Sequence, residues 1–120
     1  MIITFATQKG GTGKTTLAIA FANYISGLSE RKIKVYDFDF QKSFYYKWKE
    51  DEQSDLPKLY EVETIGEDDE QPFSDFETLI NMKESDEINL FDLAGTLDQK
   101  YSDLLIYSDF IIIPFEYSDV

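Results

Sequence analysis

A glycine-rich stretch near the start of the chain, residues 8–16, contains the residue types that bind phosphate. Glycines let the backbone N–H groups close around an anion, because without a Cβ they reach backbone angles that cost other residues energy. Lys14 would add a positive charge against the outer phosphates, and Thr15 a hydroxyl ligand for Mg²⁺. The stretch lies between an apolar, strand-like opening (residues 2–6) and an apolar helical pattern. This context favours a nucleotide site over a plain glycine turn.

The loop departs from the ordinary P-loop pattern, because Gln8 stands where the first glycine is expected, six residues before Lys14. The run from Lys9 to Thr16 instead resembles the deviant Walker A motif of the ParA/MinD family of ATPases, in which a further lysine, here Lys9, opens the loop. The resemblance implies that ATP and Mg²⁺ are the cofactors. The nucleotide-binding residues that it implies in this loop are Gly10, Gly11, Thr12, Gly13, Lys14, Thr15 and Thr16.

A second motif surrounds Asp92, which ends the apolar segment 87–92 and precedes Gly95 by three residues. Together with the glycine loop it resembles a Walker B strand joined to the DxxG-type switch II of P-loop proteins. The resemblance implies that Asp92 holds Mg²⁺ through water, beside Thr15, and that the Gly95 N–H faces the γ-phosphate. An aspartate that caps the following turn is the alternative.

A third motif, Asp37-Phe38-Asp39, ends a β-branched and aromatic segment that reads as a strand. It resembles the Walker A' segment of the family, although Phe40 replaces the customary proline. The resemblance implies that Asp39 orients or activates the attacking water and also lies near the metal. Asp37 is a candidate for a supporting place at the metal, and an aspartate solvated at the strand end is its alternative.

Lys9 carries the implication that is specific to the deviant motif. In the family, two molecules sandwich ATP face to face, and the lysine of each reaches the phosphates held by the other, much as an arginine finger acts in trans. The resemblance therefore implies an ATP-dependent homodimer, and a solvated lysine beside a turn is the alternative. The catalytic residues that it implies are Lys9, Lys14 and Asp39.

Apolar periodicity predicts strands and helices in alternation. The expected strands cover residues 2–6, 33–39, 58–65, 87–92 and 110–115. The expected helices cover residues 14–28, 43–50, 73–83 and 98–107. Alternation of this kind predicts an α/β fold with a parallel sheet and helices on both faces, the three-layer fold of P-loop NTPases.

Three details of these elements can be compared directly with a structure. Segment 58–65 alternates in polarity like an edge strand, whereas the continuous apolar run 110–115 predicts a fully buried strand. The aromatic residues of segment 43–50 are interpreted as packing residues rather than a stacking platform. The apolar face expected for the first helix consists of Leu17, Ala18, Ala20, Phe21, Tyr24, Ile25 and Leu28.

Composition limits the function classes. The 120 residues include no cysteine, which excludes disulfides and thiolate metal sites, and no apolar run could span a bilayer. With no signal-like N-terminus either, the expected location is cytoplasmic. A net charge of −13 opposes capture by DNA or an anionic membrane. The acidic run 67–70 is interpreted as a solvated loop, with a metal or basic-partner site as its alternative.

The resemblance extends as far as the strand that ends at Pro114, and family members continue well beyond that point. Residues 1–120 are therefore expected to form a single ATPase domain, the N-terminal part of the family's fold, truncated at the C-terminus. DNA binding is expected only through a C-terminal region absent here.

The expected function is a ParA-like ATPase in plasmid or chromosome partition or mobile-element transfer, with a partner protein that stimulates hydrolysis. Two alternatives stay open. One is a nucleotide-gated interaction module without useful turnover, and the other is a small-molecule kinase-like or ligase-like P-loop enzyme.

Overall fold

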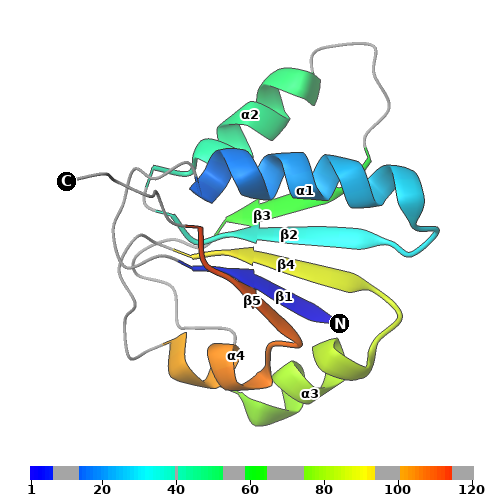
Figure 1. The fold of residues 1–120 in the computed structure, drawn as a ribbon, viewed down its shortest axis with the longest axis vertical. Helices are drawn as coiled ribbons and strands as arrows, with labels where there is room; N and C mark the ends of the chain where they lie inside the picture. Colours follow the sequence, from blue (N-terminus) through cyan, green and yellow to red (C-terminus); the bar gives the residue numbers. More distant parts are fainter. Residues whose placement is uncertain (7–13, 40, 53–58, 65–74, 94–100, 115–120) are drawn as a thin grey trace.

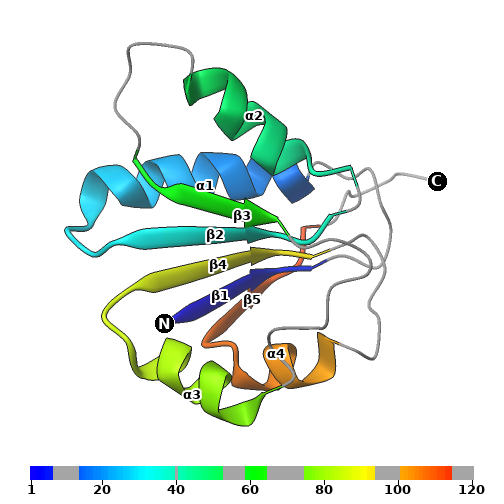
Figure 2. The same cartoon turned by 180° about the vertical axis from the view of Figure 1, so that it is seen from behind.

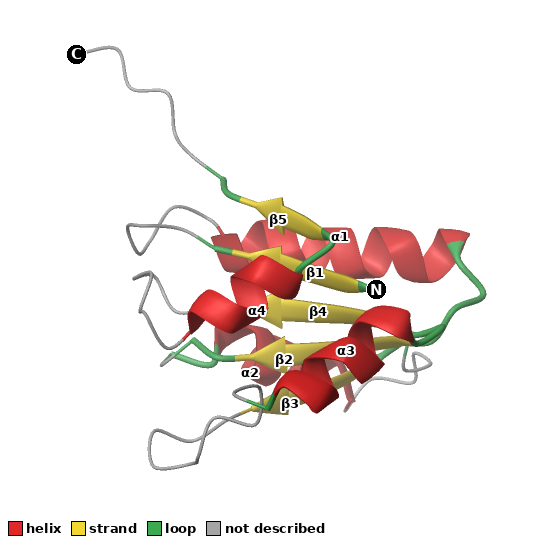
Figure 3. Ribbon diagram, turned by 90° about the horizontal axis from the view of Figure 1, so that it is seen from below, coloured by secondary structure: helices red, strands yellow, loops and turns green. Residues whose placement is uncertain are grey.

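The structure is a computed structural model, which describes residues 1–6, 14–39, 41–52, 59–64, 75–93 and 101–114. Its centre is a sheet of five strands, and all paired strands run parallel (Figure 1). The strands are β1 (Ile2–Phe5), β2 (Ile33–Asp37), β3 (Glu61–Thr64), β4 (Ile88–Asp92) and β5 (Phe110–Ile112). Their order across the sheet is β3-β2-β4-β1-β5, and their carboxyl ends share one edge (Figure 3).

Helices cover both faces of the sheet. They are α1 (Lys14–Leu28), α2 (Ser43–Glu52), α3 (Phe76–Glu84) and α4 (Ser102–Tyr107). The two opposite views show α1 and α2 on one face and α3 and α4 on the other (Figures 1 and 2). The predicted three-layer α/β fold with a parallel sheet is thereby confirmed. None of the described helices is long and apolar enough to cross a membrane.

The central strands are apolar on both sides because each face of the sheet packs against helices. Successive strand residues point to opposite faces, so Val35 and Leu90 pack toward α1 and α2, while Tyr36 and Phe91 pack toward α3 and α4. The rings of Tyr36 and Phe91 are stacked, with centroids 4.7 Å apart. Each face therefore has its own apolar core, and the two cores hold the middle of the sheet in place.

The expected edge strand is confirmed at β3, which pairs only with β2 in the described sheet. Glu61 and Glu63 are exposed on it, and the Glu63 carboxylate lies 2.9 Å from the Lys34 ammonium of β2. Charged side chains at a sheet edge discourage pairing with other chains. The alternating polarity of this segment therefore reflects its place in the sheet.

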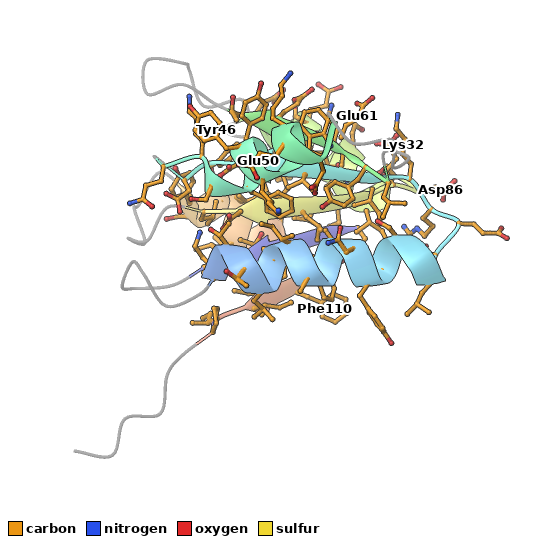
Figure 4. The ribbon with its side chains drawn as sticks, turned by 90° about the horizontal axis from the view of Figure 1, so that it is seen from above. Lys32, Tyr46, Glu50, Glu61, Asp86 and Phe110 are labelled. Carbon is orange, nitrogen blue, oxygen red and sulfur yellow. The ribbon has the colours of Figure 1, made fainter. Side chains whose placement is uncertain are left out.

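The expectation of a fully buried strand at residues 110–115 is wrong. Phe110 is 57% exposed and Ile111 is 44% exposed. The reason is position, because β1 is the only neighbour of β5 in the described sheet. Figure 4 shows Phe110 and Glu61 at opposite edges of the molecule with α1 between them. An apolar run indicates a strand that can be covered on both faces, but it does not indicate which elements cover it.

The packed face of α1 agrees only in part with the expected one, because Ala18, Phe21 and Ile25 pack on the core as expected and other members do not. Leu17, Tyr24 and Leu28 are exposed, and the residues that meet the sheet most closely are Ala18 and Ala22, exposed by 1% and 0%. Small side chains allow the helix backbone to lie close to the sheet, so the part of α1 nearest the sheet is the row that contains its two buried alanines. The expected helix bounds of residues 14–28 are confirmed.

Candidate functional site

The candidate site lies at the carboxyl ends of three adjacent strands, β2, β4 and β1, where ligands bind in open α/β sheets. Asp37 ends β2 and Asp92 ends β4, and the two residues are partners in the strand register. Beyond this pair, the Phe38 N–H donates to the Asp92 carbonyl at 2.9 Å, and the Leu93 N–H donates to the Phe5 carbonyl at 3.1 Å. Backbone pairing therefore fixes the three strand ends relative to one another.

Lys14 is the first residue of α1 and is only 5% exposed. Its ammonium donates to the Asp92 carboxylate and to the Leu93 carbonyl, and lies 3.7 Å from the Asp39 carboxylate. A buried ammonium is stable only when charged or polar partners replace its water. Lys14 thus joins the start of α1 to the ends of β4 and β2, at the helix terminus that favours anions.

Asp92 receives a second bond from the same helix, because the Thr15 hydroxyl donates to its other carboxylate oxygen at 3.0 Å. Asp92 is 1% exposed. Burial raises the pKa of Asp92, while the Lys14 ammonium and the Thr15 hydroxyl act against that increase. Thr15 and Asp92, which are both predicted to hold the metal, are thus in direct contact.

The donor set fits Mg²⁺. A threonine hydroxyl and carboxylates are oxygen ligands, and Mg²⁺ is usually held by one or two carboxylates together with phosphates and water. In the part of the chain that the structure describes, no three acidic, histidine or cysteine side chains gather into a site that could hold a metal alone. Thr15 and Asp92 would therefore share the ion with a nucleotide.

Asp39 lies in a turn after β2, which ends at Asp37 rather than at Asp39 as expected. One of its carboxylate oxygens accepts the Gln41 N–H at 3.1 Å, and the other lies 3.7 Å from the Lys14 ammonium. The Lys42 N–H closes the turn on the Asp39 carbonyl at 3.0 Å. The side chain is 22% exposed, so Asp39 combines a fixed position with access to water.

Asp37 is 0% exposed, and the alternative of a solvated strand-end aspartate is wrong. One carboxylate oxygen accepts the Asp39 N–H at 3.1 Å and the other accepts the Tyr45 N–H at 3.0 Å. Burial raises the pKa of Asp37 to about 6, although the N–H groups of Tyr45 and Asp39 lower it; the carboxylates of Asp92 and Asp39 add to the increase. Its place at a metal stays a prediction.

The structure brings together four of the predicted site residues, Lys14, Thr15, Asp39 and Asp92, with Asp37 next to them. Thr16 is exposed in the first turn of α1. The remaining predicted residues, Lys9, Gly10, Gly11, Thr12, Gly13 and Gly95, lie outside the described residues.

Sequence reasoning missed two backbone groups, the Leu93 carbonyl that accepts from Lys14 and the Tyr45 N–H that donates to Asp37. Every residue except proline carries both groups, so residue type gives no signal for either one. The aromatic residues next to Tyr45 agree in part with the packing interpretation. Phe44 is 1% exposed, whereas Tyr46 is 59% exposed and points away from α1 (Figure 4).

Comparison with known proteins agrees with this geometry. No curated protein matches the chain. A family model does match, over residues 3–116, and it describes the CobQ/CobB/MinD/ParA nucleotide-binding domain. The match covers β1 from its second residue, the four other strands, and the ends of β1, β2 and β4 where the candidate site lies. The chain belongs to the CobQ/CobB/MinD/ParA family of nucleotide-binding domains.

Proposed function

We propose that this chain binds ATP with Mg²⁺ and hydrolyses it. The observation that supports the proposal is the meeting of Lys14, Asp39 and Asp92 at the carboxyl edge of the sheet. A phosphate loop alone holds a nucleotide, whereas hydrolysis also requires a metal ligand and a group that orients water. Asp92 with Thr15 supplies the first requirement, and Asp39, fixed but accessible to water, supplies the second.

Each group has a separate task. Lys14 offers a cation at the N-terminus of α1, where the helix dipole also attracts phosphate. Thr15 and Asp92 would hold Mg²⁺, which would neutralise charge on the phosphate oxygens. Asp39 accepts a hydrogen bond from the attacking water and so aligns it. The Lys14 ammonium lies 3.7 Å from the Asp39 carboxylate, so the cation and the group that aligns water are adjacent.

The wider role is proposed from the resemblance. Residues 1–120 would form one ATPase domain. Two chains would dimerise on ATP, with Lys9 of each reaching the nucleotide of the other, and a partner protein would stimulate hydrolysis. Such a switch would serve plasmid or chromosome partition or mobile-element transfer in the cytoplasm.

The proposal is tested by measuring nucleotide binding and phosphate release in three variants. Lys14→Gln keeps hydrogen-bonding capacity beside Asp92 but removes the charge, and it should weaken Mg²⁺-ATP binding by about tenfold or more. Asp39→Asn should retain binding and lose roughly a hundredfold in hydrolysis rate. Lys34→Gln is the matched control, because Lys34 pairs with Glu63 at the sheet edge, and neither quantity should change.

The same measurements separate the alternatives. Unchanged phosphate release in Asp39→Asn would contradict the assigned role and favour a nucleotide-gated interaction module. ATP consumption that requires a small acceptor molecule would favour a kinase-like or ligase-like enzyme. If Lys14→Gln bound ATP as tightly as the parent protein, the assignment of Lys14 to a phosphate site would be wrong.

A further inference from the structure

Asp37 is completely buried, and each of its two carboxylate oxygens accepts a hydrogen bond from a different segment of the chain. The first oxygen accepts the N–H of Asp39, which lies in the turn after β2, at 3.1 Å. The second accepts the N–H of Tyr45, in the first turn of α2, at 3.0 Å. One side chain therefore connects the turn that carries Asp39 with the beginning of a helix.

The sheet holds Asp37 itself in place. Asp37 is the last residue of β2 and is in register with Asp92 of β4, and the next residue, Phe38, donates its N–H to the Asp92 carbonyl at 2.9 Å. The carboxylate is thus fixed on the strand that lies beside the metal-site aspartate. A group that is hydrogen-bonded to the Asp37 carboxylate is therefore held in place as well.

The rest of α2 is attached independently of Asp37. The Trp48 indole N–H donates to the Tyr60 carbonyl at 2.9 Å, and the Tyr60 hydroxyl bonds to the Asn23 side chain of α1 at 2.9 Å. Phe44 is buried in the core between the sheet and α1. The helix can therefore stay docked if Asp37 changes, which makes a local effect on the Asp39 turn separable from loss of the helix.

We propose that Asp37 is a positioning residue, which holds Asp39 at the reaction site by bonding its backbone N–H while it anchors the first turn of α2. The inference rests on the proposed hydrolysis. It assigns Asp37 a role different from metal ligand, because both carboxylate oxygens are directed at backbone donors and the side chain is closed to solvent. Charge-assisted bonds from N–H groups to a carboxylate are among the stronger hydrogen bonds in proteins.

The informative substitution is Asp37→Asn. The amide has similar size, but only one of its two terminal atoms accepts a hydrogen bond, so one of the two N–H groups is left facing another donor. The matched control is Asp75→Asn, because Asp75 also accepts a backbone N–H at a helix start, from Glu77 at 3.1 Å, and caps α3 on the opposite face. The control makes the same chemical change at a helix cap away from the site.

The kinetic test compares the hydrolysis rate, nucleotide affinity and Mg²⁺ requirement of the full chain. Asp37→Asn should lower kcat by about tenfold or more, while its affinity for Mg²⁺-ATP and the Mg²⁺ concentration for half-maximal rate stay within about twofold. Asp75→Asn should leave all three unchanged. A rate that excess Mg²⁺ restores would overturn the proposal in favour of a metal ligand, and an unchanged kcat would overturn it outright.

Amide hydrogen exchange, measured by NMR without nucleotide, tests the geometry separately from hydrolysis. In Asp37→Asn the amides of Asp39 and Tyr45 should exchange about tenfold faster or more, while that of Val35 in β2 stays as in the parent. An equal increase at Val35 would indicate general destabilisation and reject local positioning. A parent protein that does not hydrolyse ATP would reject the proposed function, and the exchange rates would still decide the positioning.

If Asp37→Asn does not fold, hydrogen exchange measured on the parent protein alone tests the proposal. The amides of Asp39 and Tyr45 should then be protected in the parent to a degree close to that of Val35. An Asp39 amide that exchanges as fast as a solvated loop amide would reject the bond to Asp37.

Discussion

At the scale of single residues, the site concentrates charge where water is excluded. Asp92 and Lys14 are both buried and bonded to each other, and Asp37 is buried beside them. Removing one member of a buried charge pair leaves the other without compensation, which costs more than the pair contributes. For this reason the substitutions proposed at Lys14 and Asp37 are to amides, which keep a polar group in place when the charge is removed.

Asp37 also predicts a dependence of stability on pH. Its folded-state pKa of about 6 lies above the ordinary value of 3.8, so the folded state binds the proton more tightly than the unfolded state does. Stability from this group is therefore present at low pH and is lost as the pH rises through 6. Between pH 5 and pH 7 the parent should lose about 1 kcal/mol of unfolding free energy relative to Asp37→Asn.

Urea denaturation of both proteins at a series of pH values measures this difference. The comparison with Asp37→Asn removes the contributions of other groups, among them Asp92, whose pKa is also raised by burial, and Asp109. Burial would raise the pKa of Asp109, but the Ile2 N–H and the Lys83 ammonium outweigh it and the pKa is lowered. A stability gap independent of pH would contradict the raised pKa of Asp37.

At the scale of elements, a side-chain hydrogen bond ties α2 to the segment before β3. The Trp48 indole donates to a backbone carbonyl just before β3, at Tyr60. Trp48→Phe keeps an aromatic ring but removes the donor, and should cost about 1 kcal/mol of unfolding free energy. Tyr46→Phe is the control on the same helix, because Tyr46 is 59% exposed and its ring is retained. Urea denaturation followed by circular dichroism compares the two, and equal stabilities would show that the indole bond contributes nothing.

The elements also show what the sequence can and cannot predict. The parallel sheet and the bounds of α1 were predicted from apolar periodicity, whereas the meeting of Lys14, Asp39 and Asp92 was implied by the family resemblance. The exposure of β5 did not follow, because neighbours in a sheet are set by contacts far apart in the sequence. The bond from Tyr45 to Asp37 was equally hidden, since a backbone donor has no residue-type signal.

At the scale of the whole molecule, the net charge of −13 affects the proposed dimer. Two such chains repel each other at long range, and salt screens that repulsion. Dimerisation on ATP should therefore strengthen as ionic strength rises from low to physiological values, as measured by sedimentation velocity. Lys9→Ala should abolish the dimer at every salt concentration. A dimer of Lys9→Ala as stable as that of the parent would reject the role of Lys9 in trans.

The place of β4 between β2 and β1 has a consequence for synthesis on the ribosome. Lys14 and Asp92 are 78 residues apart, and the two strands that flank β4 are made long before it. Contacts between distant parts of a chain form late, because the loop between them must close first. A growing chain thus displays its glycine loop and Asp39 well before Asp92 arrives to join them. Nucleotide that needs both halves of the site can therefore favour folding only once β4 has left the ribosome.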